Sequence, residues 1–288
     1  MIPPSFDYHS PATLPDALKL LGQFGDDAKI LSGGQSLLPL LKLRLAAPGH
    51  LVDIGRIPGL DYIKEEGGYL RLGALVREAD LEASDLVRKR YPILVDTASV
   101  VADPLVRSLA TVAGNLAHGD PANDHPATML ALGAEVEVTG PKGKRTIPVA
   151  SFFKGLFTTA LEPNEILTEV RIPVPAARSG GAYVKLERKV GDFATAGAAA
   201  VVVVGPSGAF EFVGLGLTNA ATTPVKPTKA ELFLTGKKAD AIAEAARLAA
   251  DGVSPGADRR GSTEYKREMA RVLTARALKK AYERAGGR

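Results

Sequence analysis

Two glycine-rich segments are the parts of this sequence best suited to hold a small molecule. They are Ser32-Gly33-Gly34-Gln35-Ser36 and Thr111-Val112-Ala113-Gly114-Asn115. Glycine lets the backbone turn so that several amides point the same way, and such a turn binds phosphate oxygens. A single glycine pair is more often an ordinary tight turn, with Ser36 capping the helix that follows. Two such segments in one chain favour a ligand that carries two phosphates.

The second segment opens a polar stretch that we expect to be irregular from Thr111 to His125. A loop of this kind can bring backbone amides close to a ligand. Its simplest interpretation is a surface loop, in which Asp124 caps a short helix over residues 126–132. His118 and His125 are interpreted as loop histidines that make local hydrogen bonds.

Two side chains further along the chain are unusual for their surroundings. Lys185 lies in an apolar strand, where the simplest interpretation is the solvent face of an edge strand. Phe193 follows Gly191 and Asp192, and it either packs in the core or stacks against a ring.

Composition and motifs exclude most familiar catalytic chemistry. The chain has no cysteine, so it cannot form cysteine-ligated zinc or iron–sulfur centres. Its four histidines lack the spacing of a helical metal site. The G-x-G-x-x-G, G-x-x-x-x-G-K-[ST] and G-x-S-x-G motifs are also missing. We therefore expect no catalytic acid–base residue and no metal ligand, and redox chemistry would need an organic cofactor or a partner chain.

Hydrophobic periodicity indicates which elements position these segments. In the first part we expect helices over 13–25, 37–45, 77–83, 92–101 and 126–132, and strands over 29–31, 50–54, 62–64, 69–72, 135–139, 145–149 and 166–172. Pro173-Val174-Pro175 and the glycines at 180 and 181 mark a linker. Beyond it we expect strands over 182–187, 195–204 and 210–217, then helices over 229–234, 239–250 and 263–285. The chain is thus α+β, with a three-stranded sheet and a helical bundle at its C-terminal end.

Bulk properties are those of an ordinary globular protein with two domains. The chain has 288 residues, of which 45% are hydrophobic, and a net charge of +4. The positive charge is too dispersed for a nucleic-acid-binding stripe. No apolar run reaches the length of a membrane span, and the N-terminus lacks the pattern of a signal peptide. We expect a cytoplasmic protein that is not integral to a membrane.

These segments together resemble the FAD-binding subunits of the xanthine dehydrogenase and carbon monoxide dehydrogenase family. The resemblance runs from SFDYHSP at Ser5 to the helical tail and includes SGGQSLLPLLK at Ser32 and TVAGN at Thr111. The GDPANDHPA and KVGDFATA stretches are most similar to the medium subunit of carbon monoxide dehydrogenase. The resemblance implies an FAD-binding domain of the vanillyl-alcohol oxidase (PCMH) type over residues 1–176, with subdomains over about 1–57 and 58–176. A C-terminal flavoprotein domain would cover residues 177–288.

The resemblance also implies roles for individual residues. Ser32 to Ser36 and Thr111 to Asn115 would cradle the FAD pyrophosphate, and Asp124 would contact the ribityl part of the cofactor. Val101, Leu161 and Lys185 would line the flavin, and Phe193 would place an aromatic ring against the isoalloxazine. Val112-Ala113 replaces an Ile-Gly pair that is usual in the family.

In relatives, substrate is oxidised at a molybdenum cofactor on a large subunit, and electrons pass through [2Fe–2S] clusters on a small subunit to FAD. The resemblance therefore implies a heterotrimer, as a dimer of heterotrimers, whose flavin reduces quinone, NAD or oxygen. A self-contained flavin oxidase or reductase of the same fold is an alternative. A third alternative, kept open by the change at Val112-Ala113, is a structural or assembly subunit that has lost its cofactor.

Overall fold

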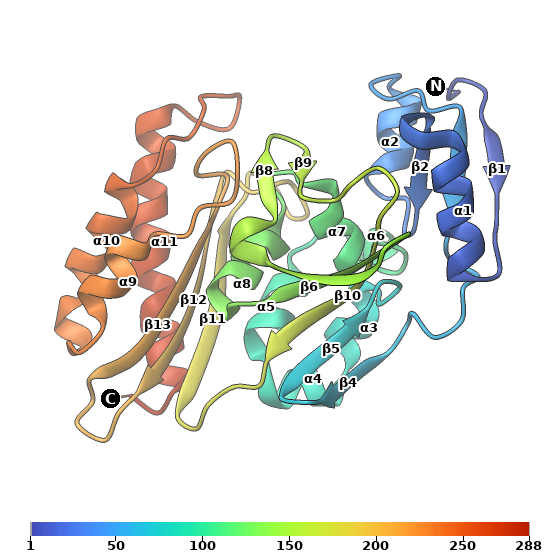
Figure 1. The fold of residues 1–288 in the computed structure, drawn as a ribbon. Helices are drawn as coiled ribbons and strands as arrows, with labels where there is room; N and C mark the ends of the chain where they lie inside the picture. Colours follow the sequence, from blue (N-terminus) through green and yellow to red (C-terminus); the bar gives the residue numbers. More distant parts are fainter. Residues whose placement is uncertain (1, 288) are drawn as a thin grey trace.

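The computed structural model describes residues 2–287 and contains three β-sheets of three or more strands, which follow one another along the chain (Figure 1). The N-terminal sheet is parallel, with the order β1 (Asp7–His9), β3 (His50–Asp53) and β2 (Ala28–Leu31). Strand β1 was not expected from the sequence, because a three-residue strand has too short a pattern to be recognised.

Helix α1 (Leu14–Phe24) packs on the N-terminal sheet and follows the expected capping chemistry. The Thr13 side chain accepts a hydrogen bond from the Asp16 amide, and the helix ends at Gly25, which has φ of 55°. Helix α2 (Leu37–Lys42) begins directly after the first glycine segment. The expected helix extended to residue 45, but it ends at Lys42, before Arg44 adopts a positive φ.

The central sheet is antiparallel and has five strands. Their order is β4 (Ile63–Glu66), β5 (Tyr69–Gly73), β10 (Ile166–Pro173), β6 (Glu135–Gly140) and β7 (Gly143–Pro148). Alternate side chains form one apolar face, whose fully buried members are Leu70, Leu72, Val136, Val138, Val170 and Ile172. A small hairpin of β8 (Phe153–Gly155) and β9 (Thr158–Thr159) precedes β10.

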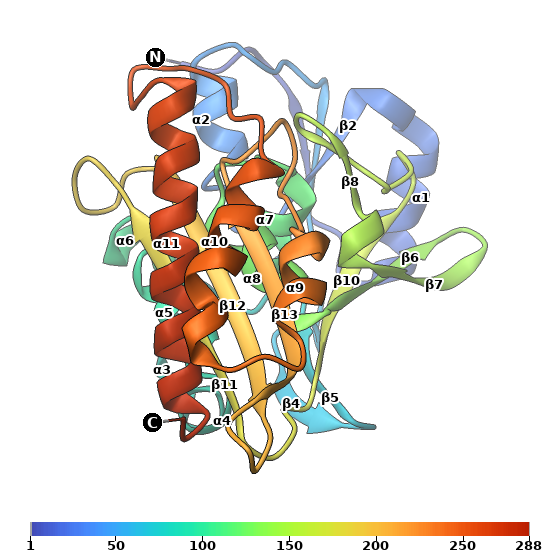
Figure 2. The same cartoon turned by 90° about the vertical axis from the view of Figure 1, so that its left-hand side faces the viewer.

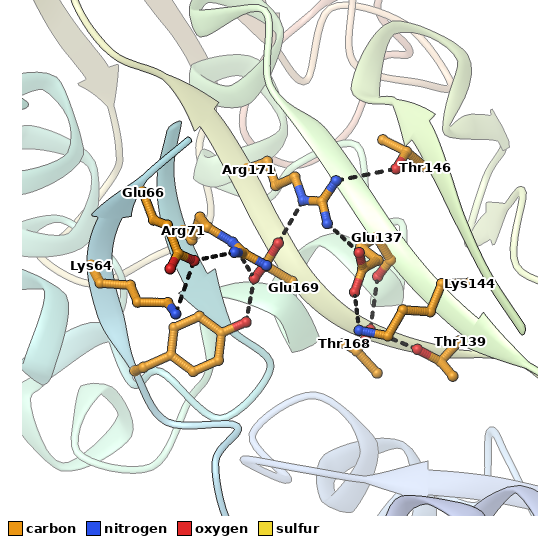
Figure 3. Close-up of polar contacts among 11 residues, drawn as sticks. Lys64, Glu66, Arg71, Glu137, Thr139, Lys144, Thr146, Thr168, Glu169 and Arg171 are labelled. Atoms are coloured by element: carbon orange, nitrogen blue, oxygen red, sulfur yellow. Dashed lines mark hydrogen bonds and ion pairs between the residues drawn. The ribbon is translucent and has the colours of Figure 1, made fainter. Parts of the chain in front are cut away.

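The opposite, polar face of the central sheet carries a network of charges (Figure 3). Like charges lie directly opposite each other, Arg71 facing Arg171 and Glu137 facing Glu169, which by itself is destabilising. Two diagonal contacts offset this: Arg71 Nε donates to Glu169 at 2.8 Å, and Arg171 donates to Glu137. Within β10, Arg171 Nε also donates to Glu169 at 2.5 Å. Burial alone would raise the pKa of Glu169, but hydrogen bonds from Arg171, Tyr62 and Arg71 lower it overall. The network therefore joins β5, β10 and β6 across the sheet.

Six helices connect β5 to β6. They are α3 (Glu78–Ala83), α4 (Asp85–Arg90), α5 (Pro92–Ser99), α6 (Pro104–Arg107), α7 (Val112–His118) and α8 (Asp124–Leu132). All of them except α6 contribute buried side chains to the core beneath the apolar face. The expectation that residues 111–125 are irregular is wrong, because α7 occupies half of this stretch. The Thr111 hydroxyl caps α7 by accepting from the Gly114 amide, and Gly119 ends it in the left-handed conformation. Glycine lowers helix propensity but does not forbid a capped helix turn.

The C-terminal part has the expected antiparallel sheet of three strands and a set of helices. The strands are β11 (Ser179–Leu186), β12 (Ala196–Val204) and β13 (Phe210–Thr218). The helices are α9 (Thr228–Leu234), α10 (Ile242–Asp251) and α11 (Thr263–Arg284). Figure 2 shows α10 and α11 lying across one face of this sheet. The α+β architecture predicted from the sequence is therefore confirmed.

Helices α5 and α8 of the preceding part cover the other face of this sheet, so β12 is buried on both sides. This explains why β12 reads as an unbroken run of alanine and valine rather than as an alternating strand. The approach of α8 is close because β13 carries glycine where the two meet. A Cβ on Gly214 would lie 2.1 Å from the Ala131 oxygen, and one on Gly216 would lie 1.9 Å from the Ala127 oxygen.

This close approach predicts the effect of a single methyl group. Gly216→Ala should separate α8 from β13 and destabilise the protein by about 1–3 kcal/mol, as overpacking of a dense core does. We expect a melting temperature lower by several degrees in thermal unfolding. Gly252→Ala is the control, because the nearest atom to its Cβ would lie 3.6 Å away. Equal melting temperatures for the two variants would contradict this account of the packing.

Candidate functional site

The two glycine segments meet face to face, although they are far apart in the sequence. The Ser32 and Thr111 hydroxyl oxygens lie 3.1 Å apart. A Cβ on Gly33 would lie 2.2 Å from the Leu109 carbonyl oxygen, so only glycine permits this approach. The second segment is held in place by an antiparallel bridge between Arg77 and Thr111.

Backbone amides remain available at this junction. Within residues 2–287, the amides of Gly33, Gly34, Gln35 and Ser36 donate no hydrogen bond to another group of the chain. In the second segment, the Val112 amide donates to Val76 and the Gly114 amide donates to the Thr111 hydroxyl. The first segment therefore supplies most of the free donors, which is the arrangement that binds phosphate oxygens.

A cleft of about 450 Å³ opens between the two segments. Pockets for cofactors and drug-sized ligands are typically about 300–1,000 Å³. Helix α1, the β8–β9 hairpin and the segment before β10 complete its walls. Lining residues from these walls are Leu21, Phe157, Thr158, Thr159, Leu161 and Glu162, and His118 of α7 lies beside them.

The cleft has few positively charged side chains, so an anion there would be bound mainly by the backbone. Among the described lining residues, Lys29 is the only one with a permanent positive charge, and it is exposed. Burial lowers the pKa of His118, so this side chain is neutral at pH 7. Glu165 is already bound by Arg145, at 2.7 Å between Oε1 and Nε. A diphosphate in this cleft would therefore be held mainly by amides and hydroxyls.

A second cluster lies where α8 meets β11. The Asp124 carboxylate accepts from Tyr183 Oη at 2.6 Å and from Lys185 Nζ at 3.0 Å. Lys185 Nζ also donates to the Val100 carbonyl oxygen at 2.9 Å. The Lys185 side chain is only 2% exposed, so its interpretation as a solvent-facing residue is wrong. Asp124 is the first residue of α8 and Asn123 precedes it as the cap, so the interpretation of Asp124 as a mere cap is also wrong.

Burial is the largest cause of the pKa shifts in this cluster. It raises the pKa of Asp124, although Lys185 and Tyr183 both favour the carboxylate. It also raises the pKa of Tyr183 well above its ordinary value, and the neighbouring Asp124 adds to this rise. Tyr183 therefore stays protonated and donates a hydrogen bond to Asp124. Together with Lys185, it holds the Asp124 carboxyl group between two side chains of β11.

The loop after β11 adds Phe193 to this region, where its side chain is 49% exposed. Gly191 of the same loop lies against the segment that follows α5, and a Cβ on Gly191 would lie 2.7 Å from the Ala102 oxygen. Val101 lies in that segment, between Val100 and Ala102. Val101 thus follows the Val100 carbonyl that binds Lys185, and the loop that carries Phe193 packs against the same segment. None of Val101, Asp124, Lys185 and Phe193 lines the cleft.

The structure therefore divides the predicted site residues into groups. Those that line the cleft are Ser32, Gly33, Gly34, Gln35, Ser36, Thr111, Gly114, Asn115 and Leu161. Val112 is buried in the core. Ala113 is also buried and does not line this cleft, but it lines a smaller pocket of about 70 Å³ that shares Ser32, Gly114 and Leu161 with the cleft.

Sequence reasoning missed several residues of this arrangement. Tyr183 was recoverable, because it lies two residues before Lys185 and alternate residues of a strand share a face. Leu109 and Phe157 had no local signal, because Leu109 meets Gly33 only through its backbone oxygen and Phe157 reaches the cleft from a two-strand hairpin. From Ile2 to Gly287, no group of three or more His, Asp or Glu side chains could hold a metal ion. Over the same span, no helix is long and apolar enough to cross a membrane.

Both parts of the chain match models of known protein families. The family model for the FAD binding domain in molybdopterin dehydrogenase matches residues 4–175. The model for the carbon monoxide dehydrogenase flavoprotein C-terminal domain matches residues 181–281. The carbon monoxide dehydrogenase medium chain of Hydrogenophaga pseudoflava is 46% identical over 99% of both chains. The xanthine dehydrogenase FAD-binding subunit of Escherichia coli O157:H7 is 31% identical over 98% of this chain and 97% of its own.

Solved structures agree with the sequence matches. The carbon monoxide dehydrogenase of Hydrogenophaga pseudoflava superimposes with a TM-score of 0.96 at 46% identity, over 99% of each chain. Quinoline 2-oxidoreductase of Pseudomonas putida 86 gives a TM-score of 0.92 at 34% identity, also over 99% of each chain. The chain therefore belongs to the family of FAD-binding medium subunits of molybdopterin dehydrogenases, oxidoreductases that include carbon monoxide dehydrogenase and xanthine dehydrogenase, as its motifs predicted.

Proposed function

We propose that this chain binds FAD with its diphosphate between the two glycine segments and acts as the electron-transfer subunit of a heterotrimeric molybdenum hydroxylase. The observation that carries the proposal is the cleft, where the free amides of residues 33–36 face the Ser32 and Thr111 hydroxyls. The same observation argues against the third alternative, a subunit that has lost its cofactor, because the cleft and the free amides of residues 33–36 are both present.

The chain's own residues would divide the work of holding the cofactor. Amides of Gly33 to Ser36, with Thr111, Gly114 and Asn115, would bind the diphosphate, and Leu161 would exclude water from the cleft. Asp124, Lys185 and Val101 would face the ribityl and ring portions, and Phe193 would cover the ring. Bound FAD supplies the ability to accept and release electrons, while the protein binds, orients and tunes it.

The complete absence of cysteine supports a division of labour between chains. Without cysteine, this subunit cannot ligate [2Fe–2S] clusters through thiolates. We propose that a small subunit carries these clusters, that a large subunit carries the molybdenum cofactor, and that the complex is a dimer of heterotrimers. The acceptor is a quinone, NAD or oxygen. We place the boundary between the FAD-binding part and the C-terminal part at residues 176 and 177, because separate buried clusters lie mainly before and after it.

A single methyl group in the cleft tests the diphosphate assignment. Gly33→Ala places its Cβ on the Leu109 carbonyl, so the two segments must separate and most bound FAD should be lost. The measurement is visible flavin absorption per protein in the purified complex, with circular dichroism to verify folding. Gly22→Ala is the control, because no atom lies within 4 Å of its Cβ.

A milder variant covers the case in which Gly33→Ala does not fold. Ser32→Ala removes one hydroxyl and should weaken FAD binding by about 1 kcal/mol, or roughly fivefold. Stoichiometric FAD in a folded Gly33→Ala complex, with unchanged affinity in Ser32→Ala, would refute the assignment.

The electron-transfer role makes a separate prediction about the isolated chain. Purified alone and loaded with FAD, it should not oxidise carbon monoxide, aldehydes or heterocycles, because substrate oxidation belongs to another subunit. In the assembled complex, whichever of these compounds is the true substrate should reduce the flavin and bleach its visible absorption. Turnover by the isolated chain would instead support the alternative of a self-contained flavin oxidase or reductase.

A further inference from the structure

The loop between β11 and β12 is supported by contacts at its base and at its middle. The Thr195 amide donates to the Leu186 oxygen at 2.7 Å, which closes the loop at its base. Gly191 has φ of +82° and lies against Ala102, which itself has a positive φ of 45°. Residues that are not glycine rarely adopt a positive φ, so Ala102 is held there by its surroundings. The loop that carries the half-exposed Phe193 ring is therefore packed against the segment that follows α5.

A charge pair lies directly behind this ring. Asp192 Oδ1 accepts from the Phe193 amide at 2.9 Å and from Arg260 Nη2 at 2.8 Å. The Arg260 guanidinium carbon lies 6.0 Å from the centre of the Phe193 ring, within the range of a cation–π contact. Arg188 Nε lies 3.4 Å from the other Asp192 oxygen. Arg260 holds the pKa of Asp192 below its ordinary value, so the carboxylate is charged at neutral pH.

Arg260 is itself anchored by the C-terminal helices. Its amide donates to Asp258 Oδ1 at 2.8 Å, and Asp258 and Gly261 form a bridge. Lys266 of α11, whose side chain is buried, binds Asp258 Oδ2 at 2.9 Å. The Nε atom of Arg260 is buried and has no partner among the described residues, which is costly for a charged donor. The fold thus places a guanidinium under Phe193 at an energetic cost.

We propose that Arg260 and Asp192 are positioning residues that hold Phe193 and set the reduction potential of the flavin beside it. This inference rests on the proposed function, because it requires FAD next to Phe193. Reduction adds negative charge to a bound flavin, so nearby charges favour or oppose it according to their sign. Together, the Arg260 and Asp192 side chains form a pair without net charge. When one of them is replaced by a neutral residue, the charge of the other is no longer balanced and should shift the reduction potential of the flavin.

Opposite shifts separate this role from a merely structural one. Arg260→Gln leaves the Asp192 carboxylate without its main partner, so the flavin becomes harder to reduce and its potential falls. Asp192→Asn keeps an acceptor for the Phe193 amide but leaves the guanidinium unpaired, so the potential rises. A structural role alone would loosen Phe193 in both variants and would not give opposite signs.

The test uses the complete complex and measures flavin content together with the midpoint potential, by spectroscopic redox titration. We expect a lower potential in Arg260→Gln, a higher one in Asp192→Asn, and a value near wild type in the double variant and in Arg260→Lys. Arg259→Gln is the matched control, because Arg259 is the exposed neighbour with the same charge and forms no ion pair with the described residues.

Several outcomes would overturn the proposal. Unchanged potentials, shifts of the same sign, or an equal shift in Arg259→Gln would each refute it. If Arg260→Gln does not fold, Asp192→Asn still requires a rise and Arg260→Lys a wild-type value. A wild-type complex that contains no flavin would refute the proposed function as well, whereas flavin with unresponsive potentials would refute only this inference.

Discussion

The contact between the two glycine segments is the constraint on which the cleft depends. Gly33 touches the backbone of Leu109, and the Ser32 hydroxyl meets the Thr111 hydroxyl at 3.1 Å. The first segment leaves β2 and the second opens α7, so this contact also fixes the N-terminal sheet against the central part. A side chain at Gly33 would push these two segments apart. Backbone shape, rather than charge, therefore creates the cleft.

The second junction, between α8 and the C-terminal sheet, uses both packing and charge. Glycines of β13 let α8 lie flat on the sheet, while Tyr183 and Lys185 of β11 bind Asp124 at the start of α8. Removing one member of a buried pair costs about 3–5 kcal/mol, because the other charge stays buried and unpaired. Asp124 therefore fixes the angle at which the C-terminal part meets the rest of the chain.

A second buried polar contact lies next to Asp124 in the core. His125 Nε2 lies 2.7 Å from Glu78 Oε2, and both side chains are fully buried. Burial would lower the pKa of His125, but Glu78 outweighs it and raises the pKa overall. The interpretation of His125 as a loop histidine was wrong, because it lies within α8 and joins that helix to α3. Titratable side chains thus follow one another from Glu78 through His125 and Asp124 to Lys185.

The sequence by itself determined most of the strands, the longer helices, the α+β class and the two glycine segments. It could do so because turns, caps and apolar periodicity are local properties of the chain, as at Thr13 and Gly25. Local patterns failed where structure depends on distant partners. Helix α7 forms at a stretch that reads as loop, because Thr111 caps it and its apolar residues pack in the core.

Only the tertiary structure decided how the site residues are grouped. Lys185 looks like a surface residue in its own strand, and it becomes buried because α8 and the Val100 carbonyl supply its partners. Arg260 carries no signal in the sequence, since its place behind Phe193 depends on the packing of α11 against the sheet. Contacts between residues far apart in the chain leave no periodic trace, so the cleft and the charge pair emerge only when the chain is folded.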